Sequence, residues 1–260
     1  MTPERWTVVG AGGAGRALRQ WLQAAGKKPR VIAGRRAVPR WLKELEAQPR
    51  GNVVLAVPDD AIEPLARQMA KARRDWRGWQ VAHTSGARSA LALGALAERG
   101  ASVGAVHPMM TFPRSGPAPS PQGVVFSVEG RARLPIEEWR GVELRLTASQ
   151  KAAYHAAATL VGPGAVAQMA AAESVLARAG VRGRKLAAAR RGLVALLEAT
   201  ARNLAAGSTR KAFTGPQARG DEATIAMQRK LLGRSPEGRL HESQMGAAAA
   251  LKRTSRSRES

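Results

Sequence analysis

The stretch Thr7-Val8-Val9-Gly10-Ala11-Gly12-Gly13-Ala14-Gly15 decides the fold of this 260-residue chain. A short apolar strand runs into the pattern G-x-G-x-x-G. The apolar side chains that follow, Leu18, Trp21 and Leu22, are spaced for one buried face of a helix. A strand before the glycines and a helix after them are the context that this pattern needs. The stretch therefore predicts a strand, a tight turn and a helix that approach each other closely.

The glycines of this stretch have separate expected roles. Gly10 allows the tight turn, Gly12 lets the backbone approach a pyrophosphate, and Gly15 lets the helix pack close to the strand. The helix N-terminus adds free N–H groups and the positive end of its dipole. The alternative is a glycine-rich turn in an α/β domain that binds no ligand. The candidate dinucleotide-binding residues here are Gly10, Ala11, Gly12, Gly13, Ala14 and Gly15.

Composition narrows the class of protein. The chain is 44% hydrophobic, which is enough for a real core, and it has no cysteine, which excludes disulfides and thiolate chemistry. No apolar run reaches the ~20 residues of a membrane span, and the N-terminus lacks a signal-peptide pattern. The four histidines are scattered, so no metal site is expected. We expect a cytoplasmic protein that does not bind a membrane.

The net charge of +23 raises the question of a nucleic-acid partner. The excess is spread over the chain: residues 1–150 carry +11 and residues 151–260 carry +12. The densest run, at 252–258, is typical of a disordered tail. This distribution argues against nucleic-acid binding as the main role, although the field would attract anionic cofactors and substrates.

The first half of the chain alternates strand and helix patterns. This alternation predicts a doubly wound parallel sheet with helices on both faces. Asp59 or Asp60 is placed to cap the helix after the third strand. The proline-rich segment 113–122 predicts a loop that lies over another part of the fold. After the first strand, the expected strands are Arg30–Ala33, Val53–Val57, Gln80–His83, Val103–His107 and Val124–Val128.

The pattern changes near residue 147. Thr147 and Gln150 have the spacing of a capping box, and alanine-rich helical patterns continue to about Leu251. We therefore expect an α/β domain at 1–146, a second, smaller all-helical domain at 147–251, and a disordered basic tail at 252–260.

The residues after the second expected strand favour one cofactor. An acidic residue there would select NAD, whereas arginine suits the 2′-phosphate of NADP. The chain has Arg35 and Arg36 at this place and no acid nearby, which favours NADP(H). The alternative is two surface arginines without a ligand. Val57 and Pro58 follow the third strand at the ligand-binding edge and are further candidates for cofactor contact.

Several further motifs, in this order, resemble one known family. They are His83-Thr84-Ser85-Gly86-Ala87, His107-Pro108-Met109-Met110-Thr111-Phe112-Pro113, Phe126-Ser127-Val128-Glu129-Gly130, Tyr154-His155-Ala156-Ala157-Ala158 and Thr214-Gly215-Pro216-Gln217-Ala218-Arg219-Gly220-Asp221. With the glycine motif, they make the chain resemble Rossmann-like proteins with a C-terminal DUF2520 domain over residues 5–235. The family is similar to the wider 6-phosphogluconate-dehydrogenase-like reductases, which include pyrroline-5-carboxylate reductase and prephenate dehydrogenase.

The resemblance implies an N-terminal NADP-binding Rossmann domain, a helical C-terminal domain used in dimerisation, and an active site between them. One branch of the family is associated with ketopantoate reduction. The sequence departs from the family pattern at two places. Val161-Gly162-Pro163-Gly164 stands where a helix usually continues and is expected to kink or break it, and Gln228 stands where a histidine is common.

Hydride transfer needs a donor to the oxygen that becomes negative. Ser85, His107 and Asn203 are the candidate catalytic residues. Ser85 could also contact the cofactor or only form a turn, and His107 could also be a buried histidine that fixes its loop. His83 is expected to be structural. Tyr154 and His155 could face the site or only pack.

The substrate-binding candidates lie in the second half of the chain. Arg219 suits a substrate carboxylate, although it could instead pair with Asp221 and hold the loop. Lys211 could protonate an alkoxide or could be an ordinary surface lysine. Asp221 is also the expected cap of the following helix. The substrate-binding candidates are Arg219, Thr214, Asp221 and Lys211.

These features together predict an NADPH-dependent reductase of a small carboxylate-bearing carbonyl compound, such as the 2-oxo acid ketopantoate, acting as a cytoplasmic homodimer. Two alternatives remain open at this point. One is an imine reductase resembling pyrroline-5-carboxylate reductase, and the other is a dinucleotide-binding protein without catalysis.

Overall fold

The computed structural model describes residues 4–113 and 115–256, with the side chains of residues 252–256 left out. The chain forms two compact units, Met1–Gly162 and Pro163–Ser260. The boundary between them falls inside one long helix, whereas the sequence pattern places it at 146/147. The domain limits 1–146 and 147–251 therefore stay a prediction.

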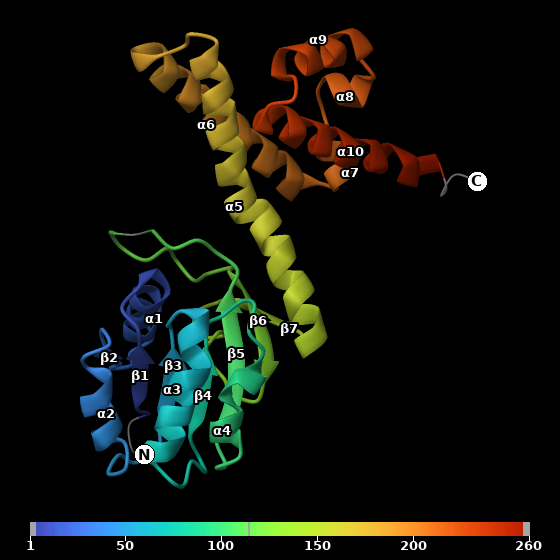
Figure 1. Ribbon diagram of the computed structural model, residues 1–260. Coiled ribbons are helices and arrows are strands. Elements are labelled where there is room, and N and C mark those ends of the chain that lie inside the picture. Colours follow the sequence, from blue (N-terminus) through green and yellow to red (C-terminus); the bar gives the residue numbers. More distant parts are fainter. Residues whose placement is uncertain (1–3, 114, 257–260) are drawn as a thin grey trace. The chain divides into compact units, whose positions relative to one another are not determined.

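A seven-stranded sheet forms the centre of the first unit (Figure 1). The strand order is β2-β1-β3-β4-β5-β6-β7, and β1 to β5 are parallel. The strands are β1 (Trp6–Val9), β2 (Arg30–Ile32), β3 (Asn52–Leu55), β4 (Gln80–His83), β5 (Ser102–Pro108), β6 (Val125–Gly130) and β7 (Val142–Arg145). The doubly wound α/β fold is confirmed.

The last two strands depart from the expected parallel pattern. β6 is antiparallel to β5, because the chain returns through a long loop rather than through a crossover helix. β7 pairs with β6 in parallel and was not predicted. All four of its residues are exposed, so β7 lacks the buried apolar run by which the inner strands were recognised.

Helices cover both faces of the sheet. α1 (Gly13–Ala24) packs on one face through Leu18, Trp21 and Leu22, the three side chains expected on its inner side. The other face carries α2 (Val38–Glu44), α3 (Asp59–Ala72), the 3₁₀ turn η1 (Ala90–Leu93) and α4 (Gly94–Ala97). Two hydrophobic clusters result, one on each side of the sheet.

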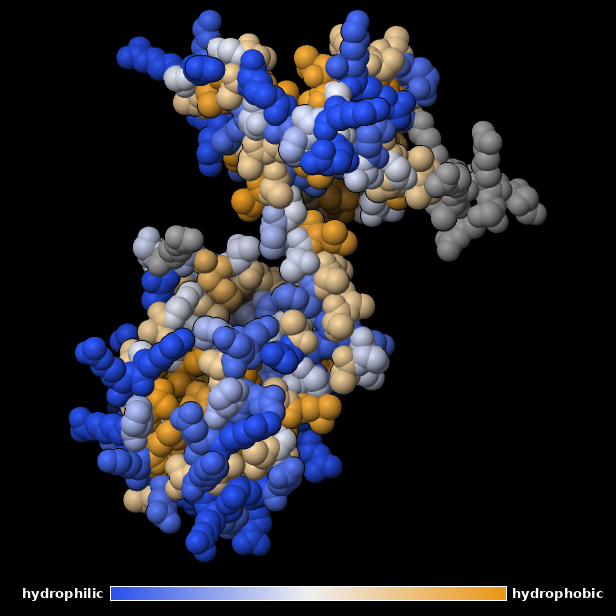
Figure 2. Space-filling model, viewed as in Figure 1, coloured by the Kyte–Doolittle hydropathy of each residue, from blue (hydrophilic) through white to orange (hydrophobic). Residues whose placement is uncertain are grey.

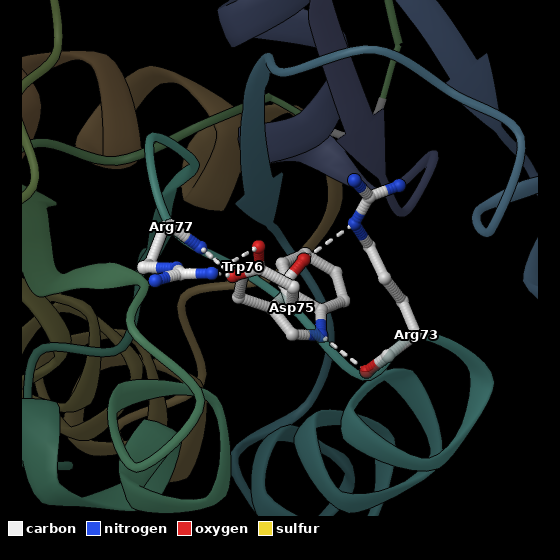
Figure 3. Close-up of polar contacts among 4 residues, drawn as sticks. All are labelled: Arg73, Asp75, Trp76 and Arg77. Carbon is white, nitrogen blue, oxygen red and sulfur yellow. Dashed lines mark hydrogen bonds and ion pairs between the residues drawn. The ribbon is translucent and has the colours of Figure 1, made fainter.

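The turn after α3 is held by Arg73, which donates to three carbonyls near the end of α2, those of Leu45, Glu46 and Gln48, at 2.9–3.0 Å. Figure 3 shows the rest of this turn. Arg73 Nε donates to the Asp75 carbonyl oxygen at 2.6 Å, and Trp76 Nε1 donates back to the Arg73 carbonyl at 3.0 Å. Arg77 binds the Asp75 carboxylate in a two-pronged contact. The turn is structural and lies outside the site described below.

The proline-rich loop lies over α1, as predicted. Trp21 Nε1 donates to the Pro119 carbonyl at 2.8 Å, and Gln20 Oε1 accepts from the Ala118 N–H at 2.8 Å. Arg16 donates to the Pro113 carbonyl at 2.7 Å. The Phe112 ring lies 5.9 Å from the Trp21 ring, so the loop packs on α1 through an aromatic contact as well.

Asp59 and Asp60 do not cap α3. Pro58 occupies the N-cap position, and no side chain makes the capping hydrogen bond. The two carboxylates lie in the first turn instead, where they still interact favourably with the positive end of the helix dipole.

α5 (Ala148–Arg178) begins with the predicted capping box. Thr147 N–H donates to Gln150 Oε1 at 2.9 Å, and Gln150 N–H donates to Thr147 Oγ1 at 3.3 Å. Val161-Gly162-Pro163-Gly164 was predicted to kink or break the helix, and the break does not occur, because α5 runs through Pro163 as one helix; the kink stays a prediction. Alanine, the strongest helix former, is frequent on both sides and offsets the cost of an internal proline.

The second unit consists of the rest of α5 and five further helices among its described residues. They are α6 (Gly183–Ala206), α7 (Thr209–Ala212), α8 (Pro216–Arg219), α9 (Glu222–Leu232) and α10 (Pro236–Arg256). α10 extends past the limit at 251 that was expected for the tail, and residues 257–260 lie outside the described part of the chain. Figure 2 shows hydrophobic atoms at the surface of this unit.

α5 is the one described helix that is long and apolar enough, by length and composition, to cross a membrane. A single helix of this kind is weak evidence for a membrane span, because soluble proteins contain helices that meet the same test. None of its apolar window is buried within the chain.

Candidate functional site

The loops at the carboxyl ends of β1, β2 and β3 meet at one edge of the sheet, which is where ligands bind in open α/β folds. Gly10 N–H donates to the Ile32 carbonyl at 3.0 Å, and Ala56 N–H donates to the Val9 carbonyl at 2.8 Å. Gly10 has φ +119, and a Cβ at this position would lie 2.0 Å from the Ala56 carbonyl oxygen. No other residue can make this turn without moving the β3 loop.

The glycines divide into two kinds. Gly15 must be glycine for packing, since a Cβ would lie 2.2 Å from the Gly10 carbonyl oxygen. A Cβ on Gly12, in contrast, would meet nothing within 4 Å. Gly12 is also the N-cap of α1 and has no side-chain cap, so the helix N-terminus opens onto this free space. The open space fits a pyrophosphate group.

The other predicted cofactor residues surround this edge. Arg35 and Arg36 are exposed in the loop after β2, and within the described residues neither makes a hydrogen bond or ion pair. Val57 and Pro58 lie in the loop between β3 and α3. Ala11 precedes Gly12, Gly13 begins α1, and Ala14 follows in the first turn of this helix. The cofactor roles of these residues stay predictions.

A row of polar side chains follows on the α3 side of β4, β5 and β6. His83 is level with Ala105 and Glu129, and His107 is level with Ser127. Cross-strand partners and residues two apart project to the same face. The strand register therefore places His83, Glu129, His107 and Ser127 together, where most of the sheet face is apolar.

His83 and Ser85 stabilise the turn after β4. Ser85 N–H donates to His83 Nδ1 at 3.2 Å, so His83 Nε2 carries the proton that the Ser89 carbonyl accepts at 3.1 Å. Burial lowers the pKa of His83 to about 4. Ser85 Oγ accepts from the N–H groups of Ala87 and Arg88 at 3.2 and 2.8 Å. These contacts support a structural role for His83 and use the Ser85 oxygen to form the turn; a catalytic or cofactor-binding role of Ser85 stays a prediction.

His107 forms a contact that the sequence does not reveal. Its Nδ1 lies 3.0 Å from the Tyr154 hydroxyl on α5. The His155 ring stands edge-on to it, with the centroids 6.0 Å apart. A Cβ on Gly86 would lie 2.4 Å from His155 Cδ2 and 3.0 Å from His107 Nε2, so only glycine fits beneath the two rings.

The electrostatics keep this pair uncharged near neutral pH. Burial, followed by the positive charges of Lys151 and His155, lowers the pKa of His107 to about 4. Burial raises the pKa of the single tyrosine, Tyr154, while the Ser127 side chain opposes the rise. The site therefore holds a protonated phenol in contact with a neutral imidazole, which is an arrangement that can give a proton to a substrate oxygen.

Lys151 is a site residue that sequence reasoning missed. It lies on α5 one turn before Tyr154, only 1% of its surface is exposed, and its Nζ has no hydrogen-bond partner among the described residues. Burial lowers its pKa, whereas the Glu129 and Asp59 carboxylates raise it. The available signal was the spacing of Lys151, Tyr154 and His155, which puts three polar side chains on one face of an otherwise apolar helix.

The remaining predicted site residues belong to the second unit. Asn203 is exposed on α6, Lys211 is exposed on α7, and Thr214 is exposed before α8. Arg219 ends α8 and is exposed. Their catalytic and substrate-binding roles stay predictions.

Asp221 caps α9, as expected. Its Oδ1 accepts from the Thr224 N–H at 3.1 Å, and its Oδ2 accepts from the Thr224 hydroxyl at 2.7 Å. These bonds lower the pKa of Asp221. The carboxylate is therefore held by Thr224, and within the described residues Arg219 forms no salt bridge with it. A substrate-binding role of Asp221 also stays a prediction.

Within the described residues, no group of histidine, aspartate or glutamate side chains could hold a metal ion.

Solved structures of similar fold extend over nearly the whole chain. A candidate NADP oxidoreductase from Bacteroides fragilis is 18% identical with a TM-score of 0.72, and covers 95% of this chain and 98% of its own. A protein from Thermotoga maritima is 20% identical with a TM-score of 0.71, and the match covers 96% of this chain and 99% of the Thermotoga protein. A reductive aminase from Aspergillus terreus, solved with NADPH and ethyl levulinate, is 17% identical with a TM-score of 0.54. This match covers 98% of this chain and 95% of the aminase.

No curated protein matches the chain closely enough to be counted. Two family profiles match it: a Rossmann-like domain at residues 5–108 and the domain of unknown function DUF2520 at residues 131–245. The glycine turn and the sheet lie in the first segment, and Lys151, Tyr154 and α6 to α9 lie in the second. The chain therefore joins a Rossmann-like domain to a C-terminal DUF2520 domain.

Proposed function

We propose that the protein is an NADPH-dependent reductase of a small carboxylate-bearing carbonyl compound, with 2-oxo acids such as ketopantoate as the first substrates to test. The observation that carries the proposal is the open space above Gly12, at the free N-terminus of α1. Gly10 and Gly15 build this turn for steric reasons, whereas the free space at Gly12 serves no packing purpose and suits a phosphate-bearing ligand.

Different residues at this edge of the sheet would bind different parts of the cofactor. The α1 N-terminus would hold the pyrophosphate, and Arg35 with Arg36 would hold the 2′-phosphate. Three strand spacings, about 14 Å, separate β1 from β5, so an extended dinucleotide bound at Gly12 can reach toward His107. When bound, NADPH supplies the hydride.

The His107–Tyr154 pair would supply the proton. A carbonyl oxygen that becomes negative on reduction needs a hydrogen-bond donor in reach. The Tyr154 hydroxyl is protonated at neutral pH and is oriented by His107 at 3.0 Å. In this proposal Tyr154 donates to the substrate oxygen, and the half-buried His107 holds the phenol in place.

Imine reduction is the second candidate, because the similar Aspergillus terreus structure is a reductive aminase bound to NADPH. A dinucleotide-binding protein without catalysis is less supported than the sequence suggested, since the predicted break of α5 is absent.

We further propose that the protein acts in the cytoplasm as a homodimer. α6 has no buried residue within the chain, and it exposes Leu196 and Leu204, which a second copy would cover.

The test is a titration with NADPH and with NADH. In the variant with Arg35→Ala and Arg36→Ala, NADPH affinity should fall about 100-fold, since two charge-assisted hydrogen bonds are lost. NADH affinity should change less than about threefold. Arg40→Ala, which removes an exposed arginine paired with Glu44, is the matched control. Oxidation of NADPH on adding a 2-oxo acid then supports the reaction, whereas a wild-type protein that binds neither nucleotide overturns the proposal.

A further inference from the structure

The first observation is a buried ammonium group with no direct partner. Lys151 has 1% of its surface exposed, and its Nζ makes no hydrogen bond or salt bridge within the described residues. Removing a lysine from water in this way costs free energy unless its charge is used or compensated. Glu129 Oε2 is likewise buried without a partner, while Glu129 Oε1 accepts from the Ser89 hydroxyl at 2.6 Å.

The second observation is where this charge lies. Lys151 precedes Tyr154 by three residues on α5, so their side chains are neighbours on the helix surface. The charged and titratable groups that act on this part of the fold come from every surrounding element: Asp59 of α3, His83 of β4, His107 of β5, Glu129 of β6, and Tyr154 and His155 of α5. Lys151 already influences His107 and His83 through space.

We propose that Lys151 is a specificity-determining residue, whose buried positive charge makes the site prefer a substrate with a neutral carbonyl group at the reacting carbon over a cationic iminium. The proposal rests on the proposed reductase function and names the substrate class of that same site. Lys151 does not touch the substrate. It acts through its charge, which reaches His107 of the His107–Tyr154 pair through space.

The two reactions differ in how charge moves. Hydride addition to a carbonyl carbon shifts the C=O π pair to oxygen, which then takes the Tyr154 proton; solvent returns a proton to the tyrosinate. A nearby positive charge stabilises this developing negative charge. Hydride addition to an iminium carbon shifts the C=N π pair to nitrogen and yields a neutral amine. The iminium is positive before the reaction, so Lys151 repels it on binding.

The experiment compares three variants of the full chain. Lys151→Met removes the charge at similar length, Lys151→Arg retains it, and Lys43→Met removes an exposed lysine of α2 as a matched control. The substrates are a 2-oxo acid and a cyclic N-methyl iminium, whose charge does not titrate. We expect Lys151→Met to lower the ratio of kcat/KM for carbonyl over iminium about 30-fold or more. Lys151→Arg and Lys43→Met should keep the ratio within about threefold.

A second readout does not depend on activity. The chain has four histidines, so their imidazole signals can be followed separately by NMR. Loss of the Lys151 charge should raise the titration midpoint of His107 by about half a pH unit or more. Lys43→Met should leave it in place. If the titration midpoint of His107 is unchanged in a folded Lys151→Met protein, the proposal is overturned, even if the reductase function stands.

If Lys151→Met does not fold, the pH dependence of the wild-type protein tests the proposal instead. Raising the pH removes the Lys151 charge, so the carbonyl-to-iminium ratio should fall on the alkaline side. A ratio that stays constant from about pH 6 to about pH 10 overturns the role of Lys151. A wild-type protein that binds no NADPH overturns the proposed function instead, and the His107 titration still tells the two failures apart.

Discussion

All six tryptophans and the single tyrosine of the chain lie in the first unit, Met1–Gly162, whereas the second unit, Pro163–Ser260, has one aromatic residue, Phe213. The first unit buries large side chains on both faces of its sheet. In the described part of the second unit, Ile225 is the one buried hydrophobic side chain. The first unit therefore carries its own core, and the second needs an additional surface to bury its leucines and valines.

The comparison shows that two regions with a similar share of hydrophobic residues can be stabilised in different ways. Aromatic side chains bury a large area at a small cost in rotamer freedom, and rings such as Trp21 and Trp139 also pack against each other, with centroids 5.5 Å apart. Alanine gives helices by propensity but contributes little area. The first unit is therefore organised by packing and the second by local helix formation.

The largest effect should come from the glycine turn of the first unit. Gly10→Ala places a Cβ against the Ala56 carbonyl in a left-handed backbone, so we expect a loss of about 4 kcal/mol in unfolding free energy. Gly12→Val should leave stability nearly unchanged and abolish dinucleotide binding, because it fills the space of the pyrophosphate. Urea unfolding followed by tryptophan fluorescence reports on the first unit alone. Equal destabilisation by both variants would contradict the division of the glycines into two kinds.

Acid should weaken the first unit next. The unfolded histidines titrate near pH 6.5, but burial lowers the pKa values of His83 and His107 to about 4. The two histidines therefore bind protons less readily in the folded protein than in the unfolded chain. Their contribution to the free energy of unfolding is fully present above about pH 6.5 and is lost as the pH falls toward 4. Each histidine should contribute on the order of 2 kcal/mol. Urea midpoints at pH 7 and pH 5 measure this loss, and His83→Asn should reduce it; a midpoint independent of pH would contradict it.

The smallest effect on the stability of the folded chain should come from the exposed face of α6. Leu196 is 64% exposed, so Leu196→Glu should change the tryptophan-detected stability by less than about 0.5 kcal/mol. It should dissociate a homodimer, as measured by sedimentation, because a buried charge would replace an apolar contact. Arg191→Glu, about 140° around the same helix, is the control. A wild-type protein that sediments as a monomer would refute the dimer directly.

The sequence alone predicted the features that depend on local rules. The glycine turn, the inner face of α1, the Thr147 capping box and the Asp221 cap follow from steric limits and backbone hydrogen bonds that act over a few residues. The continuous apolar strands are recognisable for the same reason. Two errors came from local rules that the rest of the chain outweighs: Pro163 does not break α5, and Asp59 does not cap α3.

Only the tertiary structure decided the composition of the polar site. β6 turns back antiparallel to β5, and its register brings Ser127 level with His107 and Glu129 level with Ala105. α5 then brings Lys151 and Tyr154 to the same place from more than 40 residues along the chain. Such contacts depend on strand order and register, which no short window of sequence encodes. The burial that changes the pKa values of His107, Tyr154 and Lys151 exists only once these segments have packed together.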